Sequence, residues 1–110
     1  MSDTAAIARL RAMIGGTRDG ALLRVSLATA LLATGDTAAA LVELRQALTF
    51  DADYSAAWKL LGNTLVTAGD ATGAAGAYRA GIAAAEKRGD KQACKEMTVF
   101  LKRLEKIPRD

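Results

Sequence analysis

With 110 residues, the chain has room for a single domain, taken here as residues 1–110. It is 51% hydrophobic but only 5% aromatic, and it is rich in alanine and poor in strand formers, which predicts an all-α fold. It has no histidine, the commonest acid–base group and metal ligand, and its one cysteine, Cys94, excludes an intramolecular disulfide and a Cys–His pair. We therefore expect a protein that is not an enzyme and that uses no cofactor and no metal.

Glycine and aspartate divide the chain into helices. A glycine accepts the left-handed conformation just past a helix end, and an aspartate then accepts hydrogen bonds from the free amides of the next helix. Gly35-Asp36, Gly69-Asp70 and Gly89-Asp90 have this pattern, and Asp19 and Asp53 can serve as further N-caps. The predicted helices cover residues 3–14, 20–34, 37–50, 54–68, 71–88 and 91–106, and Ile107-Pro108 ends the last of them.

The helix predicted at 71–88 contains three glycines, Gly73, Gly76 and Gly81. Each glycine costs about 1 kcal/mol relative to alanine in a helix interior. This helix should therefore be weak alone, and its stability must come from close packing against its neighbours.

A signature of a known repeat lies in the second half of the chain. Trp58-x-x-Leu61-Gly62-x-x-Leu65, followed by Ala74-x-x-x-Tyr78, nearly reproduces the pattern W-x₂-L-G-x₂-Y…A-x₃-F. The chain therefore resembles a tetratricopeptide-repeat (TPR) protein, and this resemblance implies a right-handed superhelical array of antiparallel helix hairpins. An echo lies 34 residues upstream, where Leu27, Leu31, Gly35, Asp36, Ala40 and Arg45 correspond to Leu61, Leu65, Gly69, Asp70, Ala74 and Arg79.

The resemblance covers nearly all of the chain, strongly at residues 54–81 and weakly at both ends. It implies an N-terminal half-repeat helix at 3–14, repeat 1 at 20–53, repeat 2 at 54–88 and a C-terminal capping helix at 90–107. Repeat 1 departs from the pattern, with Arg24 at the tryptophan position, Ala28 at the glycine position and Leu44 at the aromatic position. In repeat 2, Glu86 stands where a proline usually ends the repeat, so its final helix should run longer than usual.

Most signature residues should be packing residues, so the function must lie elsewhere. TPR arrays usually bind peptides on the concave surface formed by the first helix of each hairpin. Lys59 and Asn63 share a helical face there, and TPR domains that clamp a peptide's carboxylate use lysine and asparagine at such places. The residues expected on this surface are Leu22, Val25, Thr29 and Leu32 from repeat 1 and Ala56, Lys59, Asn63 and Val66 from repeat 2.

The resemblance therefore implies a non-catalytic module that binds another protein or a peptide, and two alternatives stay open. The chain could self-associate or form a subunit of a larger assembly, since small arrays leave apolar ends exposed. A less favoured alternative is binding to anionic membranes or nucleic acid through the basic last helix. The lysines of that helix, Lys91, Lys95, Lys102 and Lys106, lie on one face, opposite Ala93, Met97, Phe100 and Leu104.

The location of the protein and the state of its thiol can also be predicted. A single cysteine fits a reducing compartment, the first residues make a poor signal peptide, and no apolar run approaches the length of a membrane span. We expect a cytoplasmic protein. Cys94, between Ala93 and Met97, should be a packed and unreactive thiol.

Overall fold

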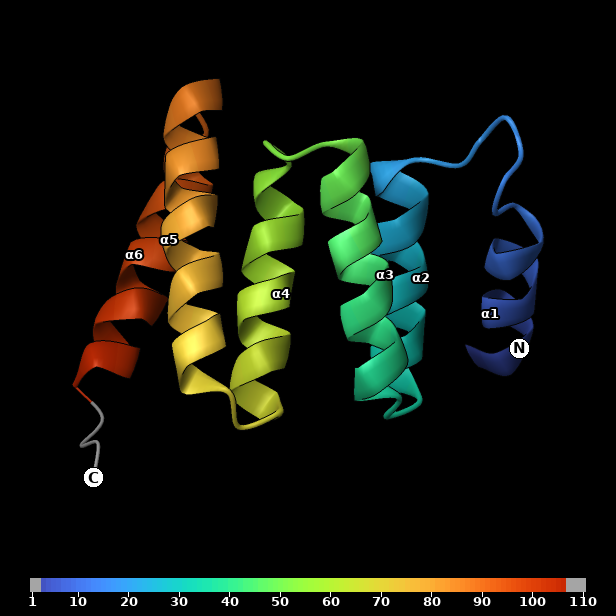
Figure 1. Ribbon diagram of the computed structural model, residues 1–110, viewed down its shortest axis with the longest axis horizontal. Coiled ribbons are helices and arrows are strands. Elements are labelled where there is room, and N and C mark those ends of the chain that lie inside the picture. The colour runs from blue at the N-terminus through green and yellow to red at the C-terminus, as the bar shows by residue number, and fades with distance from the viewer. Residues whose placement is uncertain (1–2, 107–110) are drawn as a thin grey trace. The chain divides into compact units, whose positions relative to one another are not determined.

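The computed structural model describes residues 3–106, and these residues form helices joined by short turns, with no strand among them. Figure 1 shows the helices in chain order. The all-α prediction is confirmed, and the observed ends lie within two residues of the predicted ones. The helices are α1 (Asp3–Ala12), α2 (Ala21–Ala33), α3 (Thr37–Phe50), α4 (Ser55–Thr67), α5 (Ala71–Arg88) and α6 (Lys91–Glu105).

The chain forms two compact units. The N-terminal unit is Met1–Ala52, in which α2 packs against both α1 and α3. The C-terminal unit is Asp53–Asp110, in which α5 packs against both α4 and α6, and α6 also contacts α4. As predicted from Glu86, α5 continues to Arg88.

The three Gly-Asp pairs end one helix and begin the next as predicted. Each glycine adopts a left-handed conformation, with φ of 82° at Gly35, 83° at Gly69 and 71° at Gly89. The aspartate that follows donates its backbone N–H to a carbonyl of the preceding helix, as Asp90 does to Ala85 over 2.8 Å. Its side chain then caps the next helix, so neighbouring helices fold back with almost no loop.

Asp19 and Asp53 are not the N-cap residues, so that part of the prediction is wrong. Gly20 and Tyr54 occupy the N-cap positions of α2 and α4, and neither makes a side-chain capping bond. The Asp53 carboxylate instead lies 2.8 Å from Lys87 Nζ, and Asp19 binds Arg24. The predicted stop at 107–108 lies outside the described residues.

The core of each unit consists mainly of leucine and alanine side chains, at positions that the helical spacing predicts to be buried. Leu27 and Leu31 are buried in the N-terminal unit, while Leu61, Leu65 and Tyr78 are buried in the C-terminal unit. Trp58 is only half-buried. Among residues 3–106, no helix is both long and apolar enough to cross a membrane.

The glycines of α4 and α5 have different roles, which the sequence does not distinguish. A Cβ atom at Gly62 would overlap the ring of Tyr78, and one at Gly81 would overlap Met97 and lie 2.7 Å from the Cβ of Trp58. At Gly76 the same atom would meet nothing within 4 Å. The expected close packing is therefore located at Gly62 and Gly81, whereas Gly76 keeps only the entropic cost of a helical glycine.

One cap also joins two helices of the C-terminal unit. Asp90 Oδ1 accepts a hydrogen bond from the N–H of Ala93 at 3.1 Å, and its Oδ2 accepts one from the hydroxyl of Ser55 at 3.1 Å. Ser55 is the first residue of α4 and is buried. One carboxylate therefore fixes the start of α6 and ties it to the start of α4.

Asp90→Ala should destabilise the protein more than Asp36→Ala does. Asp36 caps α3 through the N–H of Ala39 at 3.2 Å and serves as the matched control. We expect a loss of about 1 kcal/mol for the cap alone at Asp36 and about 2 kcal/mol at Asp90, where the buried Ser55 hydroxyl also loses its partner. Urea unfolding followed by circular dichroism measures both, and equal losses would mean that the bond to Ser55 adds nothing.

Candidate functional site

The candidate site is a surface of the C-terminal unit where α4 and α6 come together. We call it the α4–α6 face, and its polar side chains come from both helices. It is defined by Lys59, Asn63 and Val66 of α4 and by Glu96, Phe100 and Arg103 of α6. The sequence predicted the three residues of α4 and none of those of α6.

Lys59 is held in place by an ion pair across the two helices. Its Nζ lies 3.0 Å from Oε1 of Glu96, and both side chains keep about a third of their surface exposed, 33% and 36%. A pair with this exposure contributes little to stability, roughly 0–1 kcal/mol, because water screens it. It nevertheless orients the ammonium, which an incoming carboxylate would have to share with Glu96.

Asn63 is also engaged, with the interior of the unit rather than with Lys59. Its Oδ1 accepts a hydrogen bond of 2.5 Å from the hydroxyl of Tyr78 on α5. Tyr78 is 2% exposed, and burial raises the pKa of its phenol, so this hydroxyl stays a donor at neutral pH. The bond occupies the carbonyl of Asn63 and leaves its NH₂ group as a donor to a ligand.

Tyr78, the partner of Asn63, also lines a pocket of about 230 Å³ that the sequence did not indicate. It is lined by Val66, Tyr78, Phe100, Leu104 and Arg103. The first four side chains give it aromatic and aliphatic walls. Arg103 is the cationic member, and its Cζ lies 6.0 Å from the centroid of the Phe100 ring.

The spacing of Phe100, Arg103 and Leu104 at i, i+3 and i+4 places them on one face of α6. Their spacing in the sequence predicts that Phe100 and Leu104 lie on the packing face of a capping helix. Part of this face stays open because of the direction in which α6 packs against α4. The spacing of residues along the sequence does not indicate that direction.

The other residues predicted for the concave surface have varied environments. On α4, Ala56 is exposed and Val66 is 43% exposed. On α2 of the N-terminal unit, Leu22 is 69% exposed and Thr29 is exposed, while Val25 and Leu32 are half-buried. The hydroxyl of Thr29 donates to the carbonyl of Val25 at 2.9 Å, within its own helix.

In the N-terminal unit, the tryptophan position of the repeat holds an ionic cluster. Arg24 is 8% exposed and binds Asp19 with two hydrogen bonds, Nε to Oδ1 at 2.9 Å and Nη2 to Oδ2 at 3.0 Å. Its Nη1 also donates to Glu43 Oε1 at 2.9 Å, and its Cζ lies 5.7 Å from the ring centroid of Phe50. Arg24 is therefore a structural replacement for the tryptophan and not a surface charge.

The hydrogen bonds of this cluster also shift the pKa values of Asp19 and Arg24. Hydrogen bonds from Arg24, followed by one from the backbone N–H of Gly15, hold the pKa of the Asp19 carboxyl well below its usual range. The same bond to Asp19, with a further one to Glu43, raises the pKa of the Arg24 guanidinium. Both shifts favour the ionised forms of Asp19 and Arg24, so this pair is charged at neutral pH and belongs to the fold.

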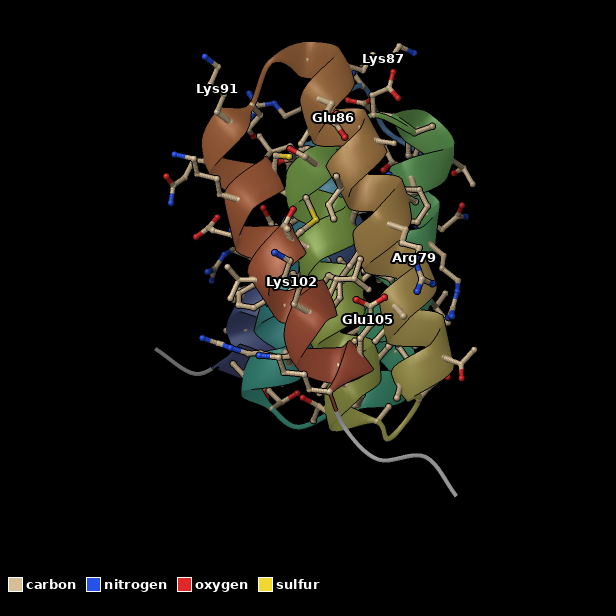
Figure 2. The ribbon with its side chains drawn as sticks, turned by 90° about the vertical axis from the view of Figure 1, so that its left-hand side faces the viewer. Arg79, Glu86, Lys87, Lys91, Lys102 and Glu105 are labelled. Carbon is tan, nitrogen blue, oxygen red and sulfur yellow. The ribbon has the colours of Figure 1, made fainter. Side chains whose placement is uncertain are left out.

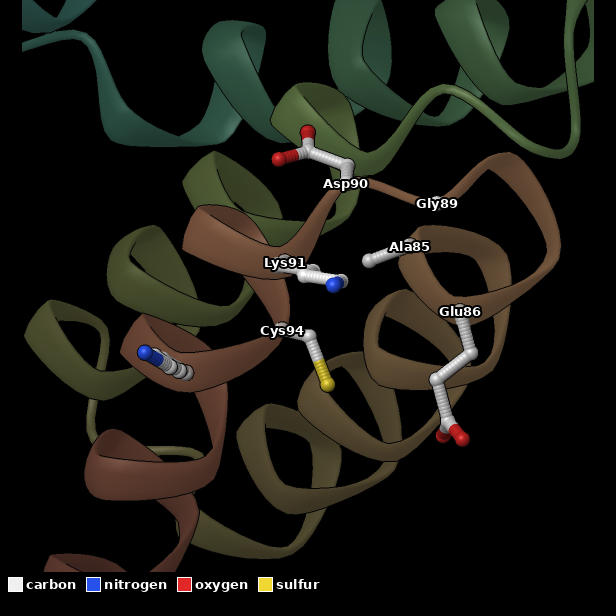
Figure 3. Close-up of a pocket in the computed structure, with 7 residues that line it drawn as sticks. Ala85, Glu86, Gly89, Asp90, Lys91 and Cys94 are labelled. Carbon is white, nitrogen blue, oxygen red and sulfur yellow. The ribbon is translucent and has the colours of Figure 1, made fainter.

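Cys94 is less enclosed than expected. It is half-buried and lines a second pocket, of about 390 Å³, between the end of α5 and the start of α6 (Figure 3). Among residues 3–106, no cluster of three or more cysteine and carboxylate side chains could hold a metal ion.

The chain is similar to known proteins from bacteria. No family model matches the chain. A protein of Pseudomonas aeruginosa named TPR repeat-containing protein is 45% identical over 97 residues, which cover 88% of this chain and 92% of that protein. The solution structure of a Bordetella parapertussis protein superposes with a TM-score of 0.76 at 47% identity and covers 90% of this chain and 86% of that chain.

A more distant structure shares the fold. The crystal structure of the Sgt2 TPR domain from Aspergillus fumigatus gives a TM-score of 0.73 at 24% identity, covering 98% of this chain and 76% of that chain. The similarity to the Pseudomonas protein extends over nearly the whole of both sequences. The chain therefore belongs to the tetratricopeptide-repeat family.

Proposed function

We propose that this protein is a non-catalytic cytoplasmic module that binds a segment of another protein on the α4–α6 face. The observation that carries the proposal is the pocket lined by Val66, Tyr78, Phe100, Leu104 and Arg103. Its apolar walls suit one aliphatic or small aromatic side chain, and Arg103 suits a carboxylate next to it. The membership of the TPR family, whose proteins generally serve as interaction scaffolds, supports this general role.

The remaining polar groups of the face would orient the bound segment. Lys59 can share its ammonium between Glu96 and a ligand carboxylate, and the NH₂ group of Asn63 can donate to a backbone carbonyl of the ligand. Binding would rest on apolar complementarity in a preformed pocket, with a few polar contacts fixing the register. Leu22, Val25, Thr29 and Leu32 remain a predicted second contact surface on α2.

Val66→Glu should strongly reduce capture of the partner, whereas Val42→Glu should not. Val66 lines the pocket and is 43% exposed, so a buried charge there would disfavour an apolar ligand side chain. Val42, on α3 of the N-terminal unit, is 58% exposed and provides the same substitution away from the face. We expect at least a tenfold drop in affinity, about 1.4 kcal/mol, for Val66→Glu alone.

The measurement is affinity capture from the host's own lysate with the full-length protein, quantified by mass spectrometry. Proteins that are captured by wild type and Val42→Glu but lost with Val66→Glu are partners of this face. Arg103→Gln should reduce the capture of these same proteins and of no others. Equal capture by all variants would refute the site. Enrichment of the bait's own sequence alone would instead support self-association, for which the exposed Leu22 is a candidate contact.

A further inference from the structure

A second surface of the C-terminal unit, distinct from the α4–α6 face, carries a row of lysines. We call it the basic stripe and define it as Lys91, Lys95, Lys102 and Lys106 with Val99 between them. At 100° per residue these five residues lie within about 80° of the helix circumference, and they span about 22 Å. All four lysines are exposed, and Val99 is 46% exposed.

The lysines of the stripe differ from other cations of the same unit. Lys59 pairs with Glu96, Arg79 with Glu105 at 3.4 Å and Lys87 with Asp53. Glu105, which the sequence places beside the stripe, turns toward Arg79 on α5 (Figure 2). Within residues 53–106, no acidic side chain forms an ion pair with any lysine of the stripe.

The larger pocket opens at one end of this stripe. Lys91 and Lys95 line it together with the apolar Ala85 and Cys94, and Gly89, Glu86 and the capping Asp90 complete its lining. Figure 3 shows the thiol of Cys94 pointing into the space between α6 and α5, with Glu86 on the far side. A pocket of about 390 Å³ has room for one large apolar side chain, so charge and apolar contact are available at adjacent places.

We propose that the basic stripe docks an acidic helical segment of another protein, with one apolar side chain of that segment in the pocket at Cys94. Carboxylates four and seven residues apart on the partner would match the lysines of α6, which follow one another at intervals of four, seven and four residues. Val99 supplies an apolar contact midway along the stripe. This docking goes beyond the proposed function and uses none of the residues of the α4–α6 face.

The fold argues against the other polyanions that four lysines could attract. A helix that adsorbs to a membrane inserts its apolar face, but Ala93, Met97 and Leu104 of α6 are buried in the unit. Single-stranded nucleic acid binds where aromatic side chains stack on bases, and the stripe contains none. An acidic protein segment needs neither feature, and it can use Val99 and the pocket.

The test uses the full chain and a synthetic probe, a helical peptide of about 16 residues with glutamates along one face and one leucine within that face. A control peptide has glutamine in place of each glutamate. We expect the glutamate peptide to bind with a Kd below about 1 mM at low salt and more weakly at about 150 mM salt, because exposed charges are screened. Isothermal calorimetry or fluorescence anisotropy measures both.

Lys95→Ala/Lys102→Ala should weaken this binding about tenfold, since two exposed ion pairs are lost. The control Arg18→Ala/Lys87→Ala removes the same net charge away from the stripe and should bind like wild type. Cys94→Leu, which fills the pocket, should weaken binding of the leucine-bearing peptide but not of the same peptide with alanine in its place.

Three results would overturn the proposal. The first is no binding of the glutamate peptide, or equal binding of the glutamine peptide. The second is an equal loss in both double variants, which would assign the effect to net charge. The third is tighter binding to phosphatidylserine vesicles or to a single-stranded DNA oligonucleotide than to the peptide. Val66→Glu should leave binding of the glutamate peptide unchanged. A failure of the basic stripe to bind can therefore be distinguished from a failure of the α4–α6 face.

Discussion

Arg24→Ala is expected to destabilise the N-terminal unit by about 2–3 kcal/mol, because removing one partner leaves buried charges without compensation. The guanidinium is 8% exposed and holds Asp19 and Glu43 through three hydrogen bonds between 2.9 and 3.0 Å. Arg24→Lys should recover only part of the loss, since an ammonium cannot make the paired contact to Asp19. Thermal and urea unfolding followed by circular dichroism measure the change.

The control is Arg45→Ala on α3, which removes the same charge from an exposed side chain. Its effect should stay within about 0.5 kcal/mol. Similar losses at both positions would mean that the cluster contributes through net charge and not through its geometry.

The pH dependence gives a second measure of the same cluster. The Asp19 carboxyl has a lowered pKa in the folded protein, so its contribution is fully present above the ordinary value of about 4. It is lost progressively as the pH falls from there toward the lower folded value, since the unfolded chain then binds the proton more readily. The difference in stability between wild type and Arg24→Ala should therefore narrow below about pH 4 and stay constant from pH 5 to 8.

Gly81→Ala should destabilise the C-terminal unit by about 2 kcal/mol, whereas Gly76→Ala should stabilise it by up to about 1 kcal/mol. A methyl group at Gly81 would overlap Met97 and the Cβ of Trp58, which is fixed to its backbone, so α4 and α5 must move apart. The same methyl group at Gly76 meets nothing within 4 Å, and alanine is the better helix former.

Gly76 and Gly81 lie five positions apart in α5. Each Gly→Ala variant therefore serves as the control for the other, because both place the same substitution in the same helix. Urea unfolding of both variants gives two free-energy changes of opposite sign. A stabilised Gly81→Ala variant would show that the contact between α4, α5 and α6 is loose enough to accept a side chain. A destabilised Gly76→Ala variant would show that α5 has a neighbour on that side.

The sequence predicted the helices well because their ends depend on local chemistry. A glycine in the left-handed conformation followed by a capping aspartate acts within a few residues, as at Gly69-Asp70. The same logic failed at Asp19 and Asp53, where a nearby cation offered a stronger partner than the free amides of a helix. Competition between a cap and an ion pair depends on the distance to Arg24 or Lys87, which is a property of the folded chain.

The candidate site could be predicted only in part. The positions of Lys59, Asn63 and Val66 follow from the repeat register. Glu96 lies 37 residues from its partner Lys59, Tyr78 lies 15 residues from its partner Asn63, and Phe100 lines the same pocket as Val66. Whether a polar side chain is available to a ligand is decided by such distant contacts, and no local pattern contains them.

The link between Ser55 and Asp90 has a consequence for cooperativity. In a solenoid each repeat contacts only its neighbours, so an end helix that packs against a single helix can fray alone. Here the first and last helices of the C-terminal unit are joined directly, at Ser55 and Asp90 and again at Lys59 and Glu96. The three helices therefore form a closed ring of contacts, and detaching α6 would also release the beginning of α4. A truncation before residue 90 would thus remove more than a terminal cap, because it would open the ring that holds the signature repeat together.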